Sequence, residues 1–504
     1  MSGIRASGCT GWQNIVVPYY SCPGRRLGRR VGIVTTFSAG ARFAASPVGR
    51  RPDGSAADRI ASRPARASLA RPAGPSPFLP APDRRERDQD MAAAEQGTPP
   101  HQGLGFAEFV AMMAALMALN ALAIDSMLPA LPEIGAALGV DDPNRRQVVI
   151  TAYLIGFGVA QLFYGPISDI FGRKPVVMAG LAAYVVAGTV SVMATDFDQM
   201  LLARLVQGIG AAATRVICMS IVRDCYGGRR MASVMSLIMI VFIAVPVVAP
   251  SVGQAIVLFG PWRWIFGFLT LAGAFVLGWV ALRLPETLPK AARSKPDVAS
   301  ILANYGTALT NRLANGYTLA TALVMGGLFG FINSAQQIFV DVLDTGTLFP
   351  VLFAFIAIFM AISSFINAKI VGRLGMRLVS HWALIGFTAA SALHAAVAYA
   401  GFESVWTFVG FQSLTMFMFG LVMSNFNAMA LEPLGRIAGT ASSTLGFATT
   451  VIGAVLGYEI GQRFDGSTVP LTLSFAVLGA AAVLVVFVTE GGRLFTARNP
   501  QPAE

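Results

Sequence analysis

The sequence predicts an all-α membrane protein in which twelve transmembrane helices form two pseudo-symmetric six-helix bundles. Of its 504 residues, 55% are hydrophobic and only 12% are charged, whereas a typical soluble domain has about a quarter charged residues. Twelve apolar runs are long enough to cross a bilayer. A short charged loop also recurs between apolar runs in both halves of the chain, which is typical of a duplicated membrane protein.

The apolar runs define the expected helices in order. A span needs about 20 predominantly apolar residues, and backbone groups in lipid must bond within the segment, so each run is expected to be a helix. The expected spans cover 107–129, 147–168, 176–195, 199–222, 231–257, 263–284, 315–340, 348–369, 378–400, 404–428, 437–460 and 468–489. The longest polar interval divides them into bundles over 105–284 and 315–490, with a cytoplasmic linker over 285–314 and a cytoplasmic tail over 491–504.

Residues 1–104 are predicted to form a disordered extension rich in Arg, Pro and Ala. The first 90 residues contain 15 Arg and no Lys against six acidic residues, so they carry most of the net charge of +11. This basic leader gives no reason to expect a nucleic-acid partner. It has no continuous apolar core for a secretory signal peptide. An organellar transit peptide is one alternative, and an untranslated leader with a true start at Met91 is another.

The short loops predict the orientation of the chain. Sixteen Lys and Arg residues lie on one side of the expected spans and four on the other. Because basic loops remain cytoplasmic, both termini are expected in the cytoplasm. The chain has four Cys and three His in no metal-binding spacing, and it contains no nucleotide-binding or familiar catalytic motif. We therefore expect no enzyme activity, no metal and no cofactor.

Ionisable side chains inside spans are costly and are therefore functional hypotheses. Asp125 lies near the outer end of span 1 and Arg204 near the outer start of span 4. The two are at similar depth, so they are expected to pair if these spans are neighbours. An acid that faces each side in turn can gain and lose a proton, which is the minimal requirement for proton coupling. The alternatives are a structural ion pair, or backbone bonding where Pro129 opens the helix end.

Other polar residues in the spans have more than one interpretation. Arg215, deeper in span 4, is expected to reach toward the cytoplasm, bind a carbonyl or face a cavity. Gln336 and Asn425 are expected to line the cavity or to hydrogen-bond between helices. Span 5 contains Pro246, Pro250 and Gly253, which suit a hinge or a tight helix crossing, and span 11 contains Gly453 and Gly457 on one face for close packing.

The duplicated loop reads GPISDIFGRKPVV over 165–177 and NAKIVGRLGMRLV over 367–379. Gly165 permits close helix contact and Gly172 a tight turn. Asp169 is expected to accept from a cation such as Arg223, or to sit at the N-terminus of a helix from the other half. With Arg173 and Lys174, these residues would form a latch on the cytoplasmic side. The alternative is a loop that only sets the topology.

This loop resembles the signature between spans 2 and 3 of the major facilitator superfamily, and the resemblance covers about residues 105–490. RLVQGIGAAA resembles the span 4 signature with its buried Arg, here Arg204. Ile170 stands where a basic residue is usual, and Ile167 replaces Leu, which weakens the latch assignment. The resemblance implies the major facilitator fold, with a central cavity between two bundles and alternating access.

Several stretches are similar, more narrowly, to the Bcr/CflA drug-resistance subfamily: IDSMLPALP, VPVVAPSVGQ with WRWIFGF and LPETL, NFNAMALEP with AGTASSTLGF, and GQRFDGSTVPL. The resemblance implies a proton-linked multidrug exporter in the bacterial inner membrane, with Asp125 as the proton-linked acid and Arg204 as its partner. Span 5 lacks the full glycine-rich antiporter signature, so exchange is implied by the subfamily alone.

The expected cargo is an amphipathic, drug-like molecule held by apolar and aromatic surface such as Phe331, Met423 and Phe426, because such surface tolerates many shapes. The proton gradient would supply the energy to a monomer in the lipid bilayer. One alternative is an exporter of a single metabolite or sugar, and another is a membrane sensor that transports nothing.

Overall fold

The computed structural model describes residues 103–293 and 298–495. The predicted N-terminal extension, apart from its last two residues, and the end of the predicted tail lie outside these ranges. Every regular element in the described ranges is helical, in agreement with the expected fold class.

Six long helices form the first bundle. They are α2 (Phe106–Asp125), α4 (Val148–Phe171), α5 (Arg173–Met193), α6 (Phe197–Cys225), α7 (Gly228–Phe259) and α8 (Arg263–Arg283). Between α2 and α4 the chain forms the short helix α3 (Leu131–Ala137), flanked by 3-10 turns at Leu128–Ala130 and Arg145–Gln147.

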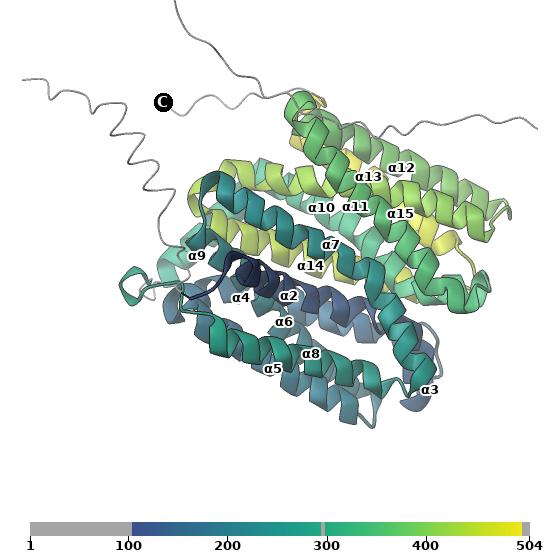
Figure 1. Cartoon of the computed structure of the whole chain (residues 1–504). Helices are drawn as coiled ribbons and strands as arrows, with labels where there is room; N and C mark the ends of the chain where they lie inside the picture. Colours follow the sequence, from purple (N-terminus) through teal and green to yellow (C-terminus); the bar gives the residue numbers. More distant parts are fainter. Residues whose placement is uncertain (1–102, 294–297, 496–504) are drawn as a thin grey trace, which may run out of the picture. The chain divides into compact units, whose positions relative to one another are not determined.

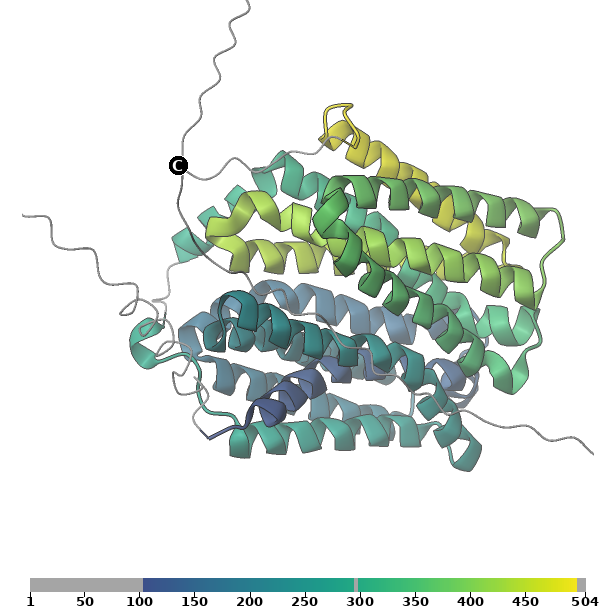
Figure 2. The ribbon, with the colours of Figure 1, turned by 45° about the horizontal axis from the view of Figure 1, so that its top comes forward.

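Six more form the second bundle. They are α10 (Arg312–Gln336), which continues as a π-helical turn over Gln337–Val342, then α11 (Phe349–Leu374), α12 (Met376–Tyr399), α13 (Val405–Leu431), α14 (Ala438–Gln462) and α15 (Val469–Thr489). In Figures 1 and 2 the purple-to-teal helices of the first bundle lie together beside the green-to-yellow helices of the second.

Eleven helical stretches in the described ranges are long and apolar enough to cross a membrane. The longest of them, Val405–Gln462, contains both α13 and α14, separated by a 3-10 turn at Glu432–Ile437. Leu434 in this turn has φ −114° and ψ 22°, outside the helical range, and Pro433 has no N–H to continue a helix. The prediction of twelve spans is therefore confirmed for the described part of the chain.

The two bundles are related by an internal two-fold pattern of packing. In the first, α4 and α5 pack on α6, and α2 packs on α7; in the second, α11 and α12 pack on α13, and α10 packs on α14. The same relation exchanges the two largest helix contacts between the bundles, α4 with α14 and α7 with α11. This is the packing expected of a duplicated chain.

In each bundle, a glycine with a positive φ separates the second long helix from the third. Gly172 (φ 105°) lies between α4 and α5, and Gly375 (φ 82°) lies between α11 and α12. Residues with a β-carbon rarely adopt this region. The duplicated loop seen in the sequence is thus a duplicated turn in the fold.

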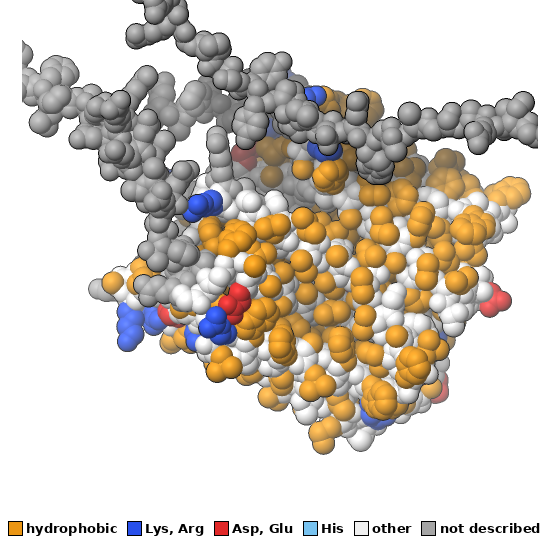
Figure 3. All heavy atoms as spheres, in the orientation of Figure 1, with side chains coloured by type: hydrophobic (Ala, Val, Ile, Leu, Met, Phe, Trp, Pro, Cys, Tyr) orange, Lys and Arg blue, Asp and Glu red, His pale blue; other side chains and the backbone are white. Residues whose placement is uncertain are grey.

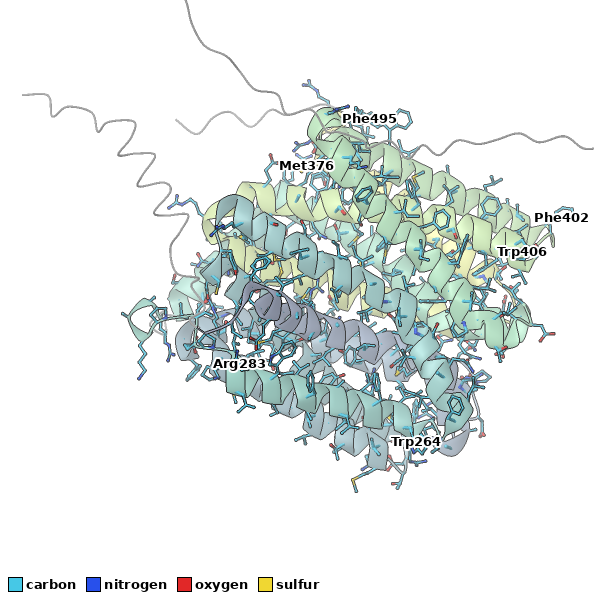
Figure 4. All side chains as sticks on the ribbon, viewed as in Figure 1. Trp264, Arg283, Met376, Phe402, Trp406 and Phe495 are labelled. Carbon is cyan, nitrogen blue, oxygen red and sulfur yellow. The ribbon has the colours of Figure 1, made fainter. Side chains whose placement is uncertain are left out.

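Charged and apolar surface are separated along the helices. Figure 3 shows Lys, Arg, Asp and Glu gathered toward the side of α9, while hydrophobic side chains cover most of the remaining described surface in that view. Arg283 lies at this end, and Trp264, Phe402 and Trp406 lie at the opposite end (Figure 4). Trp264 and Trp406 are exposed, as expected of aromatic anchors at a membrane interface.

The two ends of α4 mark the two ends of the helices: the Arg173 end, where α4 meets α5, and the Asn144 end, where α3 leads into α4. The predicted linker contains a helix that was not expected, α9 (Val298–Thr310), at the Arg173 end. The Tyr305 hydroxyl donates to the Leu162 carbonyl on α4 at 2.6 Å. The helix α9 also packs on α10 and α14 of the second bundle. The linker is therefore partly ordered and contacts both bundles.

Candidate transport site

A cavity of about 80 Å³ lies between the bundles. Asp125 at the end of α2 and Pro246 in α7 line it from the first bundle. From the second bundle it is lined by side chains of α10, α11 and α13, among them Phe331, Phe353 and Met416. Asp125 is the one charged residue in this lining. The site is thus an apolar pocket with a single carboxyl group.

Asp125 is 4% exposed. Within the described part of the chain, its oxygens accept no hydrogen bond and form no ion pair. An ionised carboxylate in such surroundings is costly unless a cation or a donor approaches it, or a proton neutralises it. The arrangement therefore suits a group that exchanges a proton with, or for, an incoming molecule.

The expected ion pair between Asp125 and Arg204 is not formed. Although α2 and α6 are neighbours, Arg204 donates to the Ala123 carbonyl at 2.8 Å and to Gln207 Oε1 at 2.5 Å. Its guanidinium also lies over the Tyr153 ring, 4.5 Å from the centroid. Arg204 is fully buried, and it holds α2 against α4 and α6 at Ala123, two residues before Asp125. Sequence spacing alone could not reveal that a backbone carbonyl takes the place of the carboxylate.

Of the six residues predicted for the cavity, only Phe331 lines it; its ring stacks on Phe353 at 5.4 Å. Asn425 instead donates to Asn367 Oδ1 on α11 at 2.7 Å, which is the helix-bonding alternative. Phe426 packs edge-on against Tyr317 inside the second bundle.

The other three predicted residues also lie outside the lining. Gln336 is buried in α10 and Met423 packs against the core of its bundle. Arg215 lies over the Phe157 ring, 5.8 Å from its centroid. Met416, two turns before Met423 on α13, lines the cavity in its place. The side of a helix on which a residue lies depends on how the helix is rotated about its axis. Near-uniform apolar runs do not define this rotation.

A charge cluster at the Arg173 end surrounds the predicted latch. The Arg173 guanidinium contacts Asp169 Oδ1 at 2.5 Å and Asp224 Oδ2 at 2.8 Å. The expected partner of Asp169, Arg223, is exposed; its guanidinium faces Gly439 on α14, where an added β-carbon would lie 3.9 Å away. The Lys174 ammonium donates to the Ala281 carbonyl. The contacts of Asp169 and Arg173 therefore lie within the first bundle.

Sequence analysis missed two acids of this cluster. Glu286 accepts from the backbone N–H groups of Arg173 (2.9 Å) and Lys174 (3.3 Å), so it caps α5, and it lies 3.6 Å from Arg293. Asp224 lies one position after Arg223. A signal was available, because both acids lie at the inner ends of predicted spans beside basic loops.

The second bundle has a related cluster at the same end. Glu490, directly after α15, accepts from Arg377 Nε at 2.9 Å and from the Tyr317 hydroxyl at 2.5 Å. Glu286 holds the corresponding position after α8. In both bundles, therefore, an acid after the sixth helix binds the start of the third.

Amide side chains join the bundles at the Asn144 end. Asn144 Nδ2 donates to the Phe464 carbonyl at 2.9 Å, and Gln462 Nε2 donates to the Asn144 carbonyl at 2.8 Å. Gln337, at the start of the π-helical turn after α10, hydrogen-bonds to both Gln147 and Asn144. These amide groups form a cluster of polar contacts between the bundles. Sequence analysis did not find Asn144, Gln147 and Gln462, because each is an ordinary amide near a helix end.

The predicted small residues lie at tight crossings. A β-carbon on Gly253 would lie 1.7 Å from the Ser126 carbonyl oxygen, and one on Gly457 would lie 2.6 Å from Phe329 Cβ. A β-carbon on Gly453 would be 3.1 Å from Met325 Cβ. Gly165 faces Ser443 across the α4–α14 contact, and Pro250 lies with Pro246 inside an unbroken α7.

Two related bundles of six membrane-crossing helices, with a cavity between them, define the class of polytopic membrane transporters built by duplication. The family model described as the Major Facilitator Superfamily matches residues 113–458. The chain belongs to this family, and it is a multi-pass transporter rather than an enzyme.

The chain is related to curated drug-resistance proteins over most of their length. It is 28% identical over 391 residues to the bicyclomycin resistance protein homolog of Haemophilus influenzae, covering 75% of this chain and 94% of the relative. It is 30% identical over 384 residues to the multidrug resistance protein MdtL of Klebsiella pneumoniae, covering 74% and 94%. The subfamily resemblance drawn from the sequence is confirmed at this level.

Solved structures support the fold alone. The human organic anion transporter MFSD10 matches with a TM-score of 0.58 at 19% identity, covering 75% of this chain and 98% of that one. The xylose transporter XylE from E. coli matches with a TM-score of 0.58 at 11% identity, covering 78% and 98%.

Proposed function

We propose that this protein exports amphipathic, drug-like compounds across the bacterial inner membrane in exchange for protons. The observation that carries the proposal is Asp125, a lone carboxyl group in the apolar lining of a cavity between the bundles. Apolar surface with few fixed polar contacts accepts varied molecules. The kinship with proteins named for multidrug and bicyclomycin resistance supports the same class of cargo.

In the proposed cycle, proton and cargo compete for Asp125. A proton bound from the outside neutralises the carboxyl group and permits the return of the empty carrier to its inward-facing state. Cargo from the cytoplasm then displaces the proton. Arg204, which fixes the end of α2 through the Ala123 carbonyl, positions Asp125 rather than pairing with it.

The positive-inside pattern supports cytoplasmic termini, and therefore a cytoplasmic Arg173 end. We propose that Asp169, Arg173, Asp224 and Glu286 form a latch that stabilises the cytoplasmic side of the first bundle in one state. Because both bundles and the cavity belong to one chain, a monomer suffices for this cycle.

Replacing Asp125 by Asn tests the proposal. In inverted membrane vesicles with an imposed pH gradient, we expect wild-type protein to accumulate a fluorescent drug such as ethidium and D125N to accumulate none above protein-free vesicles. Glu459→Gln is the matched control, because Glu459 is an exposed acid on α14. The proposal is wrong if D125N, purified as a folded monodisperse protein, retains gradient-driven uptake equal to that of E459Q.

A further inference from the structure

Within the described ranges, Arg215 is a second charged group inside the membrane region without a hydrogen-bond or ion-pair partner. It lies ten residues before the end of α6 and its side chain is partly exposed. Its guanidinium lies over the face of the Phe157 ring, 5.8 Å from the ring centroid. In the described ranges it donates no hydrogen bond and no carboxylate lies within ion-pair distance. Charges at such depth are rare and are usually paired with a carboxylate or a backbone carbonyl.

Arg204, on the same helix, is an arginine whose guanidinium has its binding partners within the protein. Its guanidinium is completely buried and has a carbonyl, an amide oxygen and an aromatic ring as partners. Within the described residues, the Arg215 guanidinium contacts only the Phe157 ring, and the side chain is partly exposed. Because a guanidinium has five donors and the pairing geometry of a carboxylate, this arrangement leaves a binding position for an anion.

The position of Arg215 follows from two contacts between antiparallel helices. Arg204 bonds the Ala123 carbonyl, and Cys218 Sγ lies 3.5 Å from the Met113 carbonyl. Interpolation places Arg215 opposite a part of α2 about ten residues from Asp125, which is roughly 15 Å along the helix axis. Asp125 and Arg215 therefore lie at different depths, within the length of one drug-sized molecule.

The face of α6 that carries Arg215 continues toward the Arg173 end. Met219 and Arg223 follow Arg215 at intervals of four residues, so the three lie on one helical face. Met219 is 40% exposed, and the Arg223 guanidinium faces Gly439 on α14 of the second bundle. This face of α6 therefore opens at the boundary between the bundles.

We infer that Arg215 binds the anionic group of a cargo molecule that enters from the Arg173 end, and that amphipathic organic carboxylates are a cargo class of this protein. A carboxylate would pair with Arg215 while its aromatic body contacts Phe157 and the apolar surface beyond. A zwitterionic cargo of suitable length would in addition bring its cation toward Asp125. The inference rests on the proposed transport function but concerns a different residue and a different part of the cargo.

A matched acid and amide test the inference. Binding of labelled 1-naphthylacetate and 1-naphthylacetamide is measured on purified wild-type protein, R215Q, R215K and the control R463Q, whose side chain is exposed. We expect the wild type and R463Q to bind the acid at least about tenfold more tightly than the amide. In R215Q this preference disappears, and in R215K most of it remains, which would separate loss of charge from misfolding.

The inference is overturned if the wild type shows no preference for the acid, or if R215Q retains the wild-type preference. Ethidium uptake by wild-type vesicles is measured in parallel. Absence of gradient-driven ethidium uptake, together with an intact Arg215-dependent preference, would overturn the proposed drug export and leave the anion site standing.

Discussion

At the residue scale, the contact between Gly253 and Ser126 fixes how closely α7 approaches the end of α2 beside Asp125. A β-carbon at Gly253 would lie 1.7 Å from a backbone oxygen that cannot rotate away. We expect Gly253→Ala to lower the free energy of unfolding by about 1–3 kcal/mol, the usual penalty for overpacking. Gly278→Ala on α8 is the control, since a β-carbon there meets nothing within 4 Å. Equal thermal melting of the two variants in detergent would contradict this prediction.

Glu403, between α12 and α13, predicts a dependence of stability on pH. Burial acts to raise its pKa, but His394, Thr407 and Thr468 together outweigh burial and hold the pKa below the ordinary value. A carboxylate with a lowered pKa stabilises the fold at neutral pH and loses this contribution on acidification. We expect Glu403→Gln to melt at a lower temperature at pH 7.

The difference from wild type should shrink as the pH falls toward about 4. Glu459→Gln serves as the exposed control. A constant difference between E403Q and wild-type melting temperatures across this pH range would exclude the role of Glu403.

Residue positions within spans could be predicted, but residue partners could not. Asp125 and Phe331 were found because a charge in an apolar run and an aromatic group near mid-span are visible in the sequence. The partners of Arg204 and Asn425 were missed because they are a backbone carbonyl and an amide on another helix. Such contacts depend on helix rotation and register, which apolar runs with little periodicity leave undefined.

At the scale of elements, the two copies of the duplicated turn distinguish two reasons for a glycine: a positive φ, and a lack of space for a β-carbon. Gly172 and Gly375 both have positive φ, but a β-carbon at Gly172 would also lie 2.5 Å from Glu286 Oε2, whereas one at Gly375 meets nothing within 4 Å. Gly372, inside α11, has neither constraint. We expect the loss of thermal stability on replacement by Ala to rise in the order Gly372, Gly375, Gly172.

The Gly375 variant measures backbone strain alone, of order 1 kcal/mol. The additional loss at Gly172 measures displacement of the Glu286 cap of α5. If G172A and G375A have the same melting temperature, the Glu286 cap contributes nothing measurable to the stability of the first bundle.

Helix bounds were predicted well, because apolar runs end where Gly, Pro and charged residues begin. The expected spans differ from the observed helices by a few residues at each end. The helix α9 was missed because its short sequence, VASILANYGTALT, lies in a polar interval and its order depends on contacts such as Tyr305 with Leu162. Tertiary contact, rather than local pattern, determines such elements.

At the scale of the whole molecule, the cavity is too small for the proposed cargo. Drug-sized sites enclose about 300–1,000 Å³, whereas the space beside Asp125 is about 80 Å³. The bundles must therefore move apart during transport. The amide contacts that join them at the Asn144 end are neutral, and the ion pair that crosses the same end, Arg146 with Asp341 at 3.9 Å, is partly exposed to solvent. These contacts can therefore break and reform at a modest cost in free energy.

These contacts predict that a cross-link at the Asn144 end stops transport. Asn144 and Gln462 exchange hydrogen bonds across the bundles, and the native Cys218 and Cys225 are buried. In N144C/Q462C, we expect a disulfide under oxidising conditions to abolish drug uptake by inverted vesicles, because the Asn144 end can no longer open. A reducing agent should restore uptake, and oxidation of N144C or Q462C alone should leave its uptake intact. If the cross-linked protein, verified by mass spectrometry, transports as fast as the reduced protein, the Asn144 end is not a gate, and the movement that enlarges the cavity must be confined to the Arg173 end.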